Sequence, residues 1–284
     1  MKKSIPVVLI VLVALTATLL AGCGNSAPTP GTAWANSEVF TYTVKDADRD
    51  NAQIATMTVT TERLSAGTYR IGAIDRDFTV SSTQSQGGGL RVKTSAVAPD
   101  GTVLMESESL LNGFTALASY KKVANGDVNY ETRAYYDGKN YHYQSGSAEW
   151  QSVKIKSGFL DNELLYMVLR CYSEIDSAYS ATYNIPNPLN GVVEKIAVSV
   201  VGTEQSSYTV KYIDLEDKEV EAAKPVTVLS LSKSESPVGT SIGVWYTKSD
   251  FALPGVGGKT ASYHIPVKIV ENNLTYELVT VKIR

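Results

Sequence analysis

Histidine and cysteine are scarce in this sequence, and each occurs only twice among 284 residues. Zinc sites draw on histidine, cysteine and carboxylate side chains at short spacings, and no cluster of these residues has such a spacing. His142 and His264 stand apart and read as ordinary strand residues, so no acid and base pair can be nominated. We therefore expect no catalytic residues, no metal and no cofactor, and we predict that the protein is not an enzyme.

An excess of basic residues is also missing, since 26 Lys and Arg face 29 Asp and Glu. Without a positive field the chain cannot exploit attraction to a phosphate backbone or to anionic lipid. We therefore expect no nucleic-acid partner. Residues 257–260 spell Gly-Gly-Lys-Thr, but position 253 is leucine where a phosphate-binding loop needs its first glycine. We interpret residues 253–260 as a loop between strands that gates whatever the sheet encloses.

The chain has one long apolar run, at its N-terminus. Lys2 and Lys3 precede an uncharged stretch over residues 5–20, which is shorter than the ~20 residues of a membrane-spanning helix. Residues 20–23, Leu-Ala-Gly-Cys, resemble the lipobox of bacterial lipoproteins. The resemblance implies a signal peptide over residues 1–22 and attachment of acyl chains such as palmitate to Cys23. The alternative is an uncleaved membrane anchor.

The lipobox prediction defines the rest of the chain. A Pro- and Ser-containing linker over residues 23–37 would tether a single β-rich domain over residues 38–284 outside the cytoplasm, on the cell membrane or the outer membrane. The mature chain carries 24 basic and 29 acidic residues, a formal charge of −5. With Cys23 acylated, Cys171 is the only remaining thiol and no internal disulfide is possible. We interpret Cys171 as a buried small residue rather than a nucleophile.

Alternation of apolar and polar residues dominates the chain from Glu38 onward. Phe40, Tyr42 and Val44 recur at every second position, and the same period returns in residues 54–61, 242–246, 265–269 and 274–278. Period two indicates half-buried strands. Asp-Gly and Asn-Gly pairs separate these runs and are typical of hairpin turns; one of them predicts a hairpin over residues 134–143. Consecutive hairpins favour an antiparallel sheet.

One segment has helical spacing. Apolar residues fall at 160, 164, 165, 168, 169 and 172, with acidic residues in the first turn and Arg170 in the last. We expect one long amphipathic helix over residues 160–172. A shorter acidic segment, residues 215–223, is interpreted as a solvated turn of helix or a loop. A large twisted sheet curls as strands are added, so the helix is expected on its concave face.

This order of elements resembles the half-barrel of periplasmic lipoprotein carriers and mycobacterial lipid-carrier lipoproteins, within a poorly characterised branch of envelope proteins. The residues that carry the resemblance are the opening strand 39–44 paired to 54–61, the helix 160–172, and the closing strands 244–250, 265–271 and 274–282. The resemblance implies a mainly β fold, a large curved antiparallel sheet around one helix. It also implies an apolar pocket between the two.

Two functions follow from these expectations. The first is non-enzymatic binding of a hydrophobic small molecule, a lipid or a lipidated partner in the concave face, with Leu160, Leu164, Leu165 and Val168 in the pocket wall. The second is an interaction module with a filled core that acts on another envelope protein. A hydrolase would be favoured over both by a pocket that presents two close carboxylates.

Overall fold

The computed structural model describes residues 34–283 except for 82–87, 114, 127, 156–158, 171–179, 214–217, 234–240, 248–251, 255–259 and 263. The predicted signal peptide, Cys23 and Cys171 lie outside the described residues, as does most of the expected gating loop. Within the described part of the chain no helix is long and apolar enough to cross a membrane.

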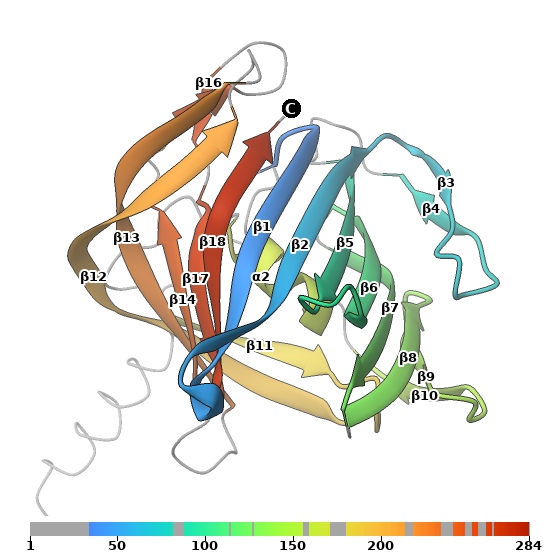
Figure 1. The fold of residues 1–284 in the computed structure, drawn as a ribbon. Helices are drawn as coiled ribbons and strands as arrows, with labels where there is room; N and C mark the ends of the chain where they lie inside the picture. The colour runs from blue at the N-terminus through green and yellow to red at the C-terminus, as the bar shows by residue number, and fades with distance from the viewer. Residues whose placement is uncertain are drawn as a thin grey trace, which may run out of the picture.

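Strands make up most of the described chain (Figure 1). The first nine are β1 (Ser37–Asp46), β2 (Ala52–Leu64), β3 (Gly67–Tyr69), β4 (Phe78–Val80), β5 (Gly89–Val97), β6 (Val103–Asn112), β7 (Thr115–Asn125), β8 (Val128–Tyr136) and β9 (Asn140–Ser145). The next nine are β10 (Gln151–Lys154), β11 (Ser180–Pro186), β12 (Val193–Ile213), β13 (Glu219–Lys233), β14 (Ser241–Thr247), β15 (Ala252–Pro254), β16 (Thr260–Ser262), β17 (Pro266–Glu271) and β18 (Leu274–Ile283).

Fourteen of these strands form a single sheet in the order β10-β9-β8-β7-β6-β5-β2-β1-β18-β17-β14-β13-β12-β11. All neighbours in that order are antiparallel, and β12 makes one further, parallel contact with β18 at Tyr212 and Ile213. No pairing among the described residues joins the edge strands β10 and β11, so the large sheet is not closed into a barrel. The predicted mainly antiparallel fold is confirmed.

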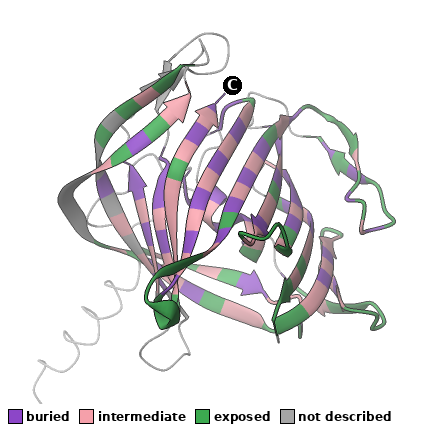
Figure 2. Cartoon of the chain, in the orientation of Figure 1, coloured by how far each residue is buried: buried purple, intermediate pink, exposed green. Residues whose placement is uncertain are grey.

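Local sequence signals account for several of the pairings between consecutive strands. Phe40 pairs with Val59 as expected for the opening strands, and Tyr136 pairs with Tyr141 in the predicted hairpin. Gly138, in the turn of that hairpin, has a φ of 97°, which glycine adopts without steric strain. Buried and less buried residues alternate along β1 and β2 (Figure 2), because successive side chains point to opposite faces of the sheet.

The helix is confirmed in place but is shorter than predicted. It consists of a 3-10 turn over Asn162–Leu164 continued by α2 over Leu165–Leu169, eight residues rather than thirteen. The Asp161 carboxylate accepts a hydrogen bond from the Glu163 amide at 2.9 Å, so the cap fixes the start. Phe159 and Leu160 lie before the helix, and the Leu160 amide donates to the carbonyl oxygen of Asn184 in β11.

The expectation for residues 215–223 is wrong where the structure describes it, because residues 219–223 open β13. Val220 pairs with Tyr212, so the acidic segment forms half of a long hairpin. Ladder hydrogen bonds to β12 outweigh the weak helix signal of a short acidic run.

The main core lies between the sheet and α2. Figure 1 shows the sheet curving around α2, and the helix residues Leu165, Val168 and Leu169 join one cluster with buried residues of β1, β2 and β18. A smaller cluster occupies the opposite face. There the hairpin of β3 and β4 packs Phe78 and Val80 against residues that include Leu110 of β6.

Candidate functional site

Strand β7 anchors the start of the helix to the concave face. Ser119 and Lys121 are two positions apart, so their side chains share one face of the sheet. The Ser119 hydroxyl donates to the Asp161 carboxylate at 2.8 Å, and the Lys121 ammonium lies 3.0 Å from the Glu163 carboxylate. The N-terminal end of the helix is therefore fixed to the sheet through two polar contacts.

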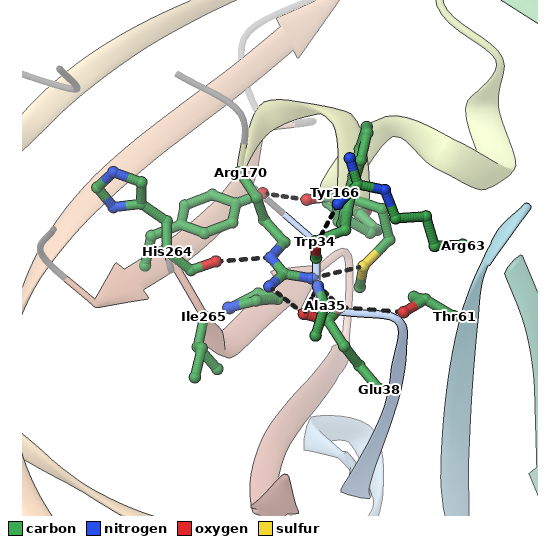
Figure 3. A network of polar contacts seen from close by, with 12 residues as sticks. Trp34, Ala35, Glu38, Thr61, Arg63, Tyr166, Arg170, His264 and Ile265 are labelled. Atoms are coloured by element: carbon green, nitrogen blue, oxygen red, sulfur yellow. Dashed lines mark hydrogen bonds and ion pairs between the residues drawn. The ribbon is translucent and has the colours of Figure 1, made fainter. Parts of the chain in front are cut away.

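A buried ion pair anchors the other end (Figure 3). The Arg170 guanidinium contacts both carboxylate oxygens of Glu38, with Nη1 at 2.7 Å and Nη2 at 3.1 Å. Its Nε donates to the carbonyl oxygen of His264 at 2.7 Å, and Glu38 accepts a further bond from the Thr61 hydroxyl. Neither side chain of the pair is exposed. This network links the C-terminal end of α2 to β1 and β2.

Between the two anchors lies a cavity of about 130 Å³, called here the inner cavity. The apolar part of its wall consists of Met57, Val59, Val92, Met105, Met167 and Ile269. The chain has four methionines in all, and the three that follow Met1 line this one cavity. Methionine side chains are flexible and polarizable and adapt to irregular apolar shapes. The wall is therefore suited to an apolar group of variable shape.

A second cavity of about 210 Å³, called here the outer cavity, lies beside the first. Its lining includes Tyr130, Ile185, Leu189 and Ile196. Four residues line both cavities and are called here the junction: Lys121, Asn162, Glu163 and Glu271. The two cavities together fall at the lower end of the size range of small-molecule sites, which begins at about 300 Å³.

The junction is polar and partly buried. Lys121 and Glu163 expose 21% and 14% of their side chains, respectively. Burial on its own would lower the pKa of Lys121, but the nearby carboxylates of Glu163 and Glu271 outweigh it and raise that pKa above its usual value. The Tyr166 hydroxyl donates to Glu271 at 3.4 Å. Burial and the Glu271 charge raise the pKa of Tyr276 to about 12.

Asp161 is buried next to the junction residues Asn162 and Glu163 and lines neither cavity. Burial and the neighbouring Glu163 charge raise the pKa of its carboxyl to about 6, against the opposing hydrogen bond from Ser119. The cap of the helix is therefore a group whose charge changes slightly below neutral pH.

The four pocket residues named from the sequence are buried in the main core. Leu160 is 7% exposed, and Leu164, Leu165 and Val168 are each 1% exposed. The cavity linings are formed instead by their neighbours at positions 162, 163, 166 and 167. Cys23, the proposed lipidation site, lies outside the described residues. The sequence pattern thus located the segment that borders the cavity, but a different side of that segment, with both polar and apolar residues, faces it.

Groups that could support catalysis are few in the part of the chain that the structure describes. His142 Nε2 lies 2.8 Å from the Asp137 carboxylate, and His264 Nδ1 lies 2.7 Å from the carbonyl oxygen of Thr247. Among the described residues no three His, Cys, Asp or Glu side chains gather in a way that could hold a metal. Neither histidine lines the inner or the outer cavity.

Residues 239–243 spell Gly-Thr-Ser-Ile-Gly, the letter pattern of a hydrolase nucleophile elbow, which the sequence reasoning missed. In an elbow the serine follows a strand and precedes a helix. Ser241 instead begins β14 and pairs with Ser232 of β13 in an antiparallel ladder. The match is therefore one of letters without the structural context.

No protein-family model and no curated protein matches this sequence. The chain is similar to a beta-barrel-like protein of domain of unknown function DUF1849 from Brucella abortus, with 10% identity and a TM-score of 0.41 over 88% of this chain and 99% of that chain. It is also similar to a "putative lipoprotein" from Parabacteroides distasonis, with 8% identity and a TM-score of 0.32 over 89% and 99%. Both likenesses are weak.

Proposed function

We propose that this is a lipid-anchored extracytoplasmic protein, without enzymatic activity, that binds a hydrophobic ligand between α2 and the concave face of the sheet. The observation that carries the proposal is the inner cavity, whose wall gathers Met57, Met105 and Met167. A preformed cavity with an adaptable apolar wall and a few polar groups is the usual form of a small-molecule site. A core filled by side chains, as an interaction module would have, leaves no such space.

The size of the inner cavity limits what it accepts. A cavity of about 150 Å³ binds one benzene molecule, so about 130 Å³ holds roughly six heavy atoms. A longer ligand would pass the junction and continue into the outer cavity. The ligand is therefore a small amphiphile or the end of a longer chain, and it is not a whole acyl chain held in the inner cavity alone.

Native mass spectrometry of the full chain, released from nanodiscs, tests ligand binding. We expect an adduct of defined mass on the natural sequence. Met105 lines the inner cavity and is only half-buried, so Met105→Trp should fill the space and remove the adduct. A ligand-free spectrum, together with no change of melting temperature on adding short aliphatic alcohols, would count against the proposal.

Metabolic labelling with palmitate tests the anchor separately. We expect label on the natural chain and none on Cys23→Ser, because a thioether needs the thiol of Cys23. Equal labelling of the two chains would contradict the lipobox interpretation while leaving the cavity proposal untouched.

A hydrolase is the second candidate, because two carboxylates, Glu163 and Glu271, border the inner cavity. Paired carboxylates serve as acid and base in glycoside hydrolysis. Binding is favoured over catalysis since Glu163 forms an ion pair with Lys121 and Glu271 accepts the Tyr166 hydroxyl. Hydrolysis of chromogenic glycosides that is lost in both Glu163→Gln and Glu271→Gln would favour the enzyme.

A further inference from the structure

The junction between the two cavities carries more negative than positive charge. The described residues that line either cavity include one cation, Lys121, and three carboxylates, Glu163, Glu194 and Glu271. Lys121 is already engaged with Glu163 at 3.0 Å. Asp161, buried next to the junction, adds a carboxyl that is largely ionised above pH 6. A ligand that reaches the junction therefore meets a negative field.

The remaining polar groups at the junction are mostly acceptors. Carboxylates accept hydrogen bonds and cannot donate them when ionised. The amide nitrogen of Asn162 donates one of its two N–H groups to Glu163 at 3.2 Å, and its amide oxygen is an acceptor. The Tyr276 hydroxyl, on the inner-cavity side, can donate as well as accept, and burial together with the Glu271 charge raises its pKa, so it stays protonated at neutral pH. The junction thus offers several acceptor oxygens to an ammonium group, which has three N–H donors to satisfy.

The partial burial of the junction makes this charge effective. Charges near a protein surface interact several times more strongly than in bulk water because the effective dielectric constant is lower. A free carboxylate or phosphate at the junction would face like charges, and like-charge contacts are how binding sites reject wrong ligands. A fatty acid or an anionic phospholipid is therefore a poor fit to this site.

We infer that the ligand is a cationic amphiphile: an ammonium group at the junction of Lys121, Asn162, Glu163 and Glu271, with an apolar part of about six heavy atoms in the methionine-lined inner cavity. This inference rests on the proposed function and names its ligand class. It separates the protein from carriers whose ligands end in an acid.

Three probes of matched length test the inference: pentylammonium, 1-pentanol and pentanoate. Each is titrated by calorimetry into the full chain held in nanodiscs of zwitterionic lipid, with empty nanodiscs as the blank. We expect pentylammonium to bind about tenfold more tightly than 1-pentanol, a difference that corresponds to ~1.4 kcal/mol. We expect pentanoate to bind at least tenfold more weakly than 1-pentanol.

The variant Glu271→Gln removes one junction charge with little change of shape. It should weaken pentylammonium binding about tenfold and leave 1-pentanol binding within twofold. The matched control is Glu277→Gln, since Glu277 pairs with Lys45 on the outer side of β18 and is 42% exposed; it should change neither. If the net charge of the protein alone were responsible, both variants would weaken pentylammonium binding equally, and this result would overturn the inference.

The outcomes distinguish the inference from the function on which it rests. If 1-pentanol binds, Met105→Trp abolishes that binding, and pentylammonium has no advantage, the cavity is a ligand site and the ammonium inference is wrong. If none of the three probes binds, both the inference and the proposed function fail. Preference for pentanoate would overturn the inference and would place Lys121 as the group that recognises the ligand.

Discussion

The Glu38 carboxylate and the Arg170 guanidinium meet in two contacts of 2.7 and 3.1 Å although 132 positions separate them in the chain. Both side chains are completely buried, and the Phe40 ring lies 5.1 Å from the guanidinium carbon. A bidentate pair fixes orientation as well as distance. The pair therefore sets how the C-terminal end of α2 sits on β1, while Ser119 and Lys121 hold the other end.

Removing the charge of Glu38 should lower the free energy of unfolding substantially. In Glu38→Gln the buried guanidinium loses its counter-charge, and breaking a buried pair costs about 3–5 kcal/mol of unfolding free energy. Urea denaturation followed by tryptophan fluorescence measures the loss, since Trp34 is buried beside this network. The control is Glu277→Gln, which breaks an exposed pair and should cost less than about 1 kcal/mol. Equal costs for the two variants would show that the buried pair has no special role.

Because the pKa of Asp161 is raised in the folded protein, the unfolding free energy decreases as pH rises. The folded protein holds this proton up to about pH 6, whereas the unfolded chain releases it near the ordinary value of 3.8. Between these values the native state binds more protons, so the unfolding free energy falls as pH rises. The full loss is of the order of 3 kcal/mol and is complete above pH 6.

Asp161→Asn should remove that loss, because asparagine caps a helix nearly as well as aspartate and stays neutral. We expect the variant to be about 1–3 kcal/mol more stable than the natural chain at pH 7.5, with the difference vanishing below pH 4. Urea denaturation of both chains across this range measures it. A difference that stays constant with pH would show that Asp161 is not the titrating group.

Position 191 requires glycine, because of its backbone conformation and because of the side chain packed against it. Its φ is 73°, and a Cβ at this position would collide with the ring of Tyr143, whose hydroxyl donates to Gln151 at 2.7 Å. Gly191→Ala should therefore cost about 2–4 kcal/mol, the sum of backbone strain and a displaced ring. Gly126→Ala, with φ 60° and no atom within 4 Å, should cost only the strain, about 1 kcal/mol. Similar melting temperatures for both variants would contradict this.

Much of the sheet could be predicted because strands and turns are encoded locally. Alternation predicted the two strands in which Phe40 pairs with Val59, and Asp137-Gly138 predicted the turn between β8 and β9. The length of the helix was not encoded in the same way. Its apolar spacing runs on to Tyr172, but the Asp161 cap starts the helix at Asn162 and α2 ends at Leu169.

The cavity could not be predicted because its residues come from distant strands whose registers the sequence does not state. Met57, Met105 and Met167 meet only after β2, β6 and α2 are placed, and a register shift between Ala96 and Val97 affects which residues of β5 and β6 face each other. Glu38 carries no local signal that its partner is Arg170.

Met167 and Leu165 of α2 allow a test of which side of this helix faces the ligand. Met167 lines the inner cavity and is 5% exposed, whereas Leu165 is 1% exposed and lines neither cavity. Truncating either side chain to alanine should cost about 2–5 kcal/mol of unfolding free energy. Met167→Ala should also enlarge the inner cavity by several methylene groups, so that longer ligands fit.

We therefore expect Met167→Ala to shift binding from 1-pentanol toward 1-heptanol, while Leu165→Ala leaves the preference of the natural chain unchanged. Burial of each additional methylene contributes about 0.8 kcal/mol, so two of them should raise the affinity ratio of 1-heptanol to 1-pentanol by about tenfold. Calorimetric titration of both alcohols into both variants measures the ratio. A shift in Leu165→Ala and none in Met167→Ala would place the ligand on the apolar side of α2, where the sequence pattern first located it.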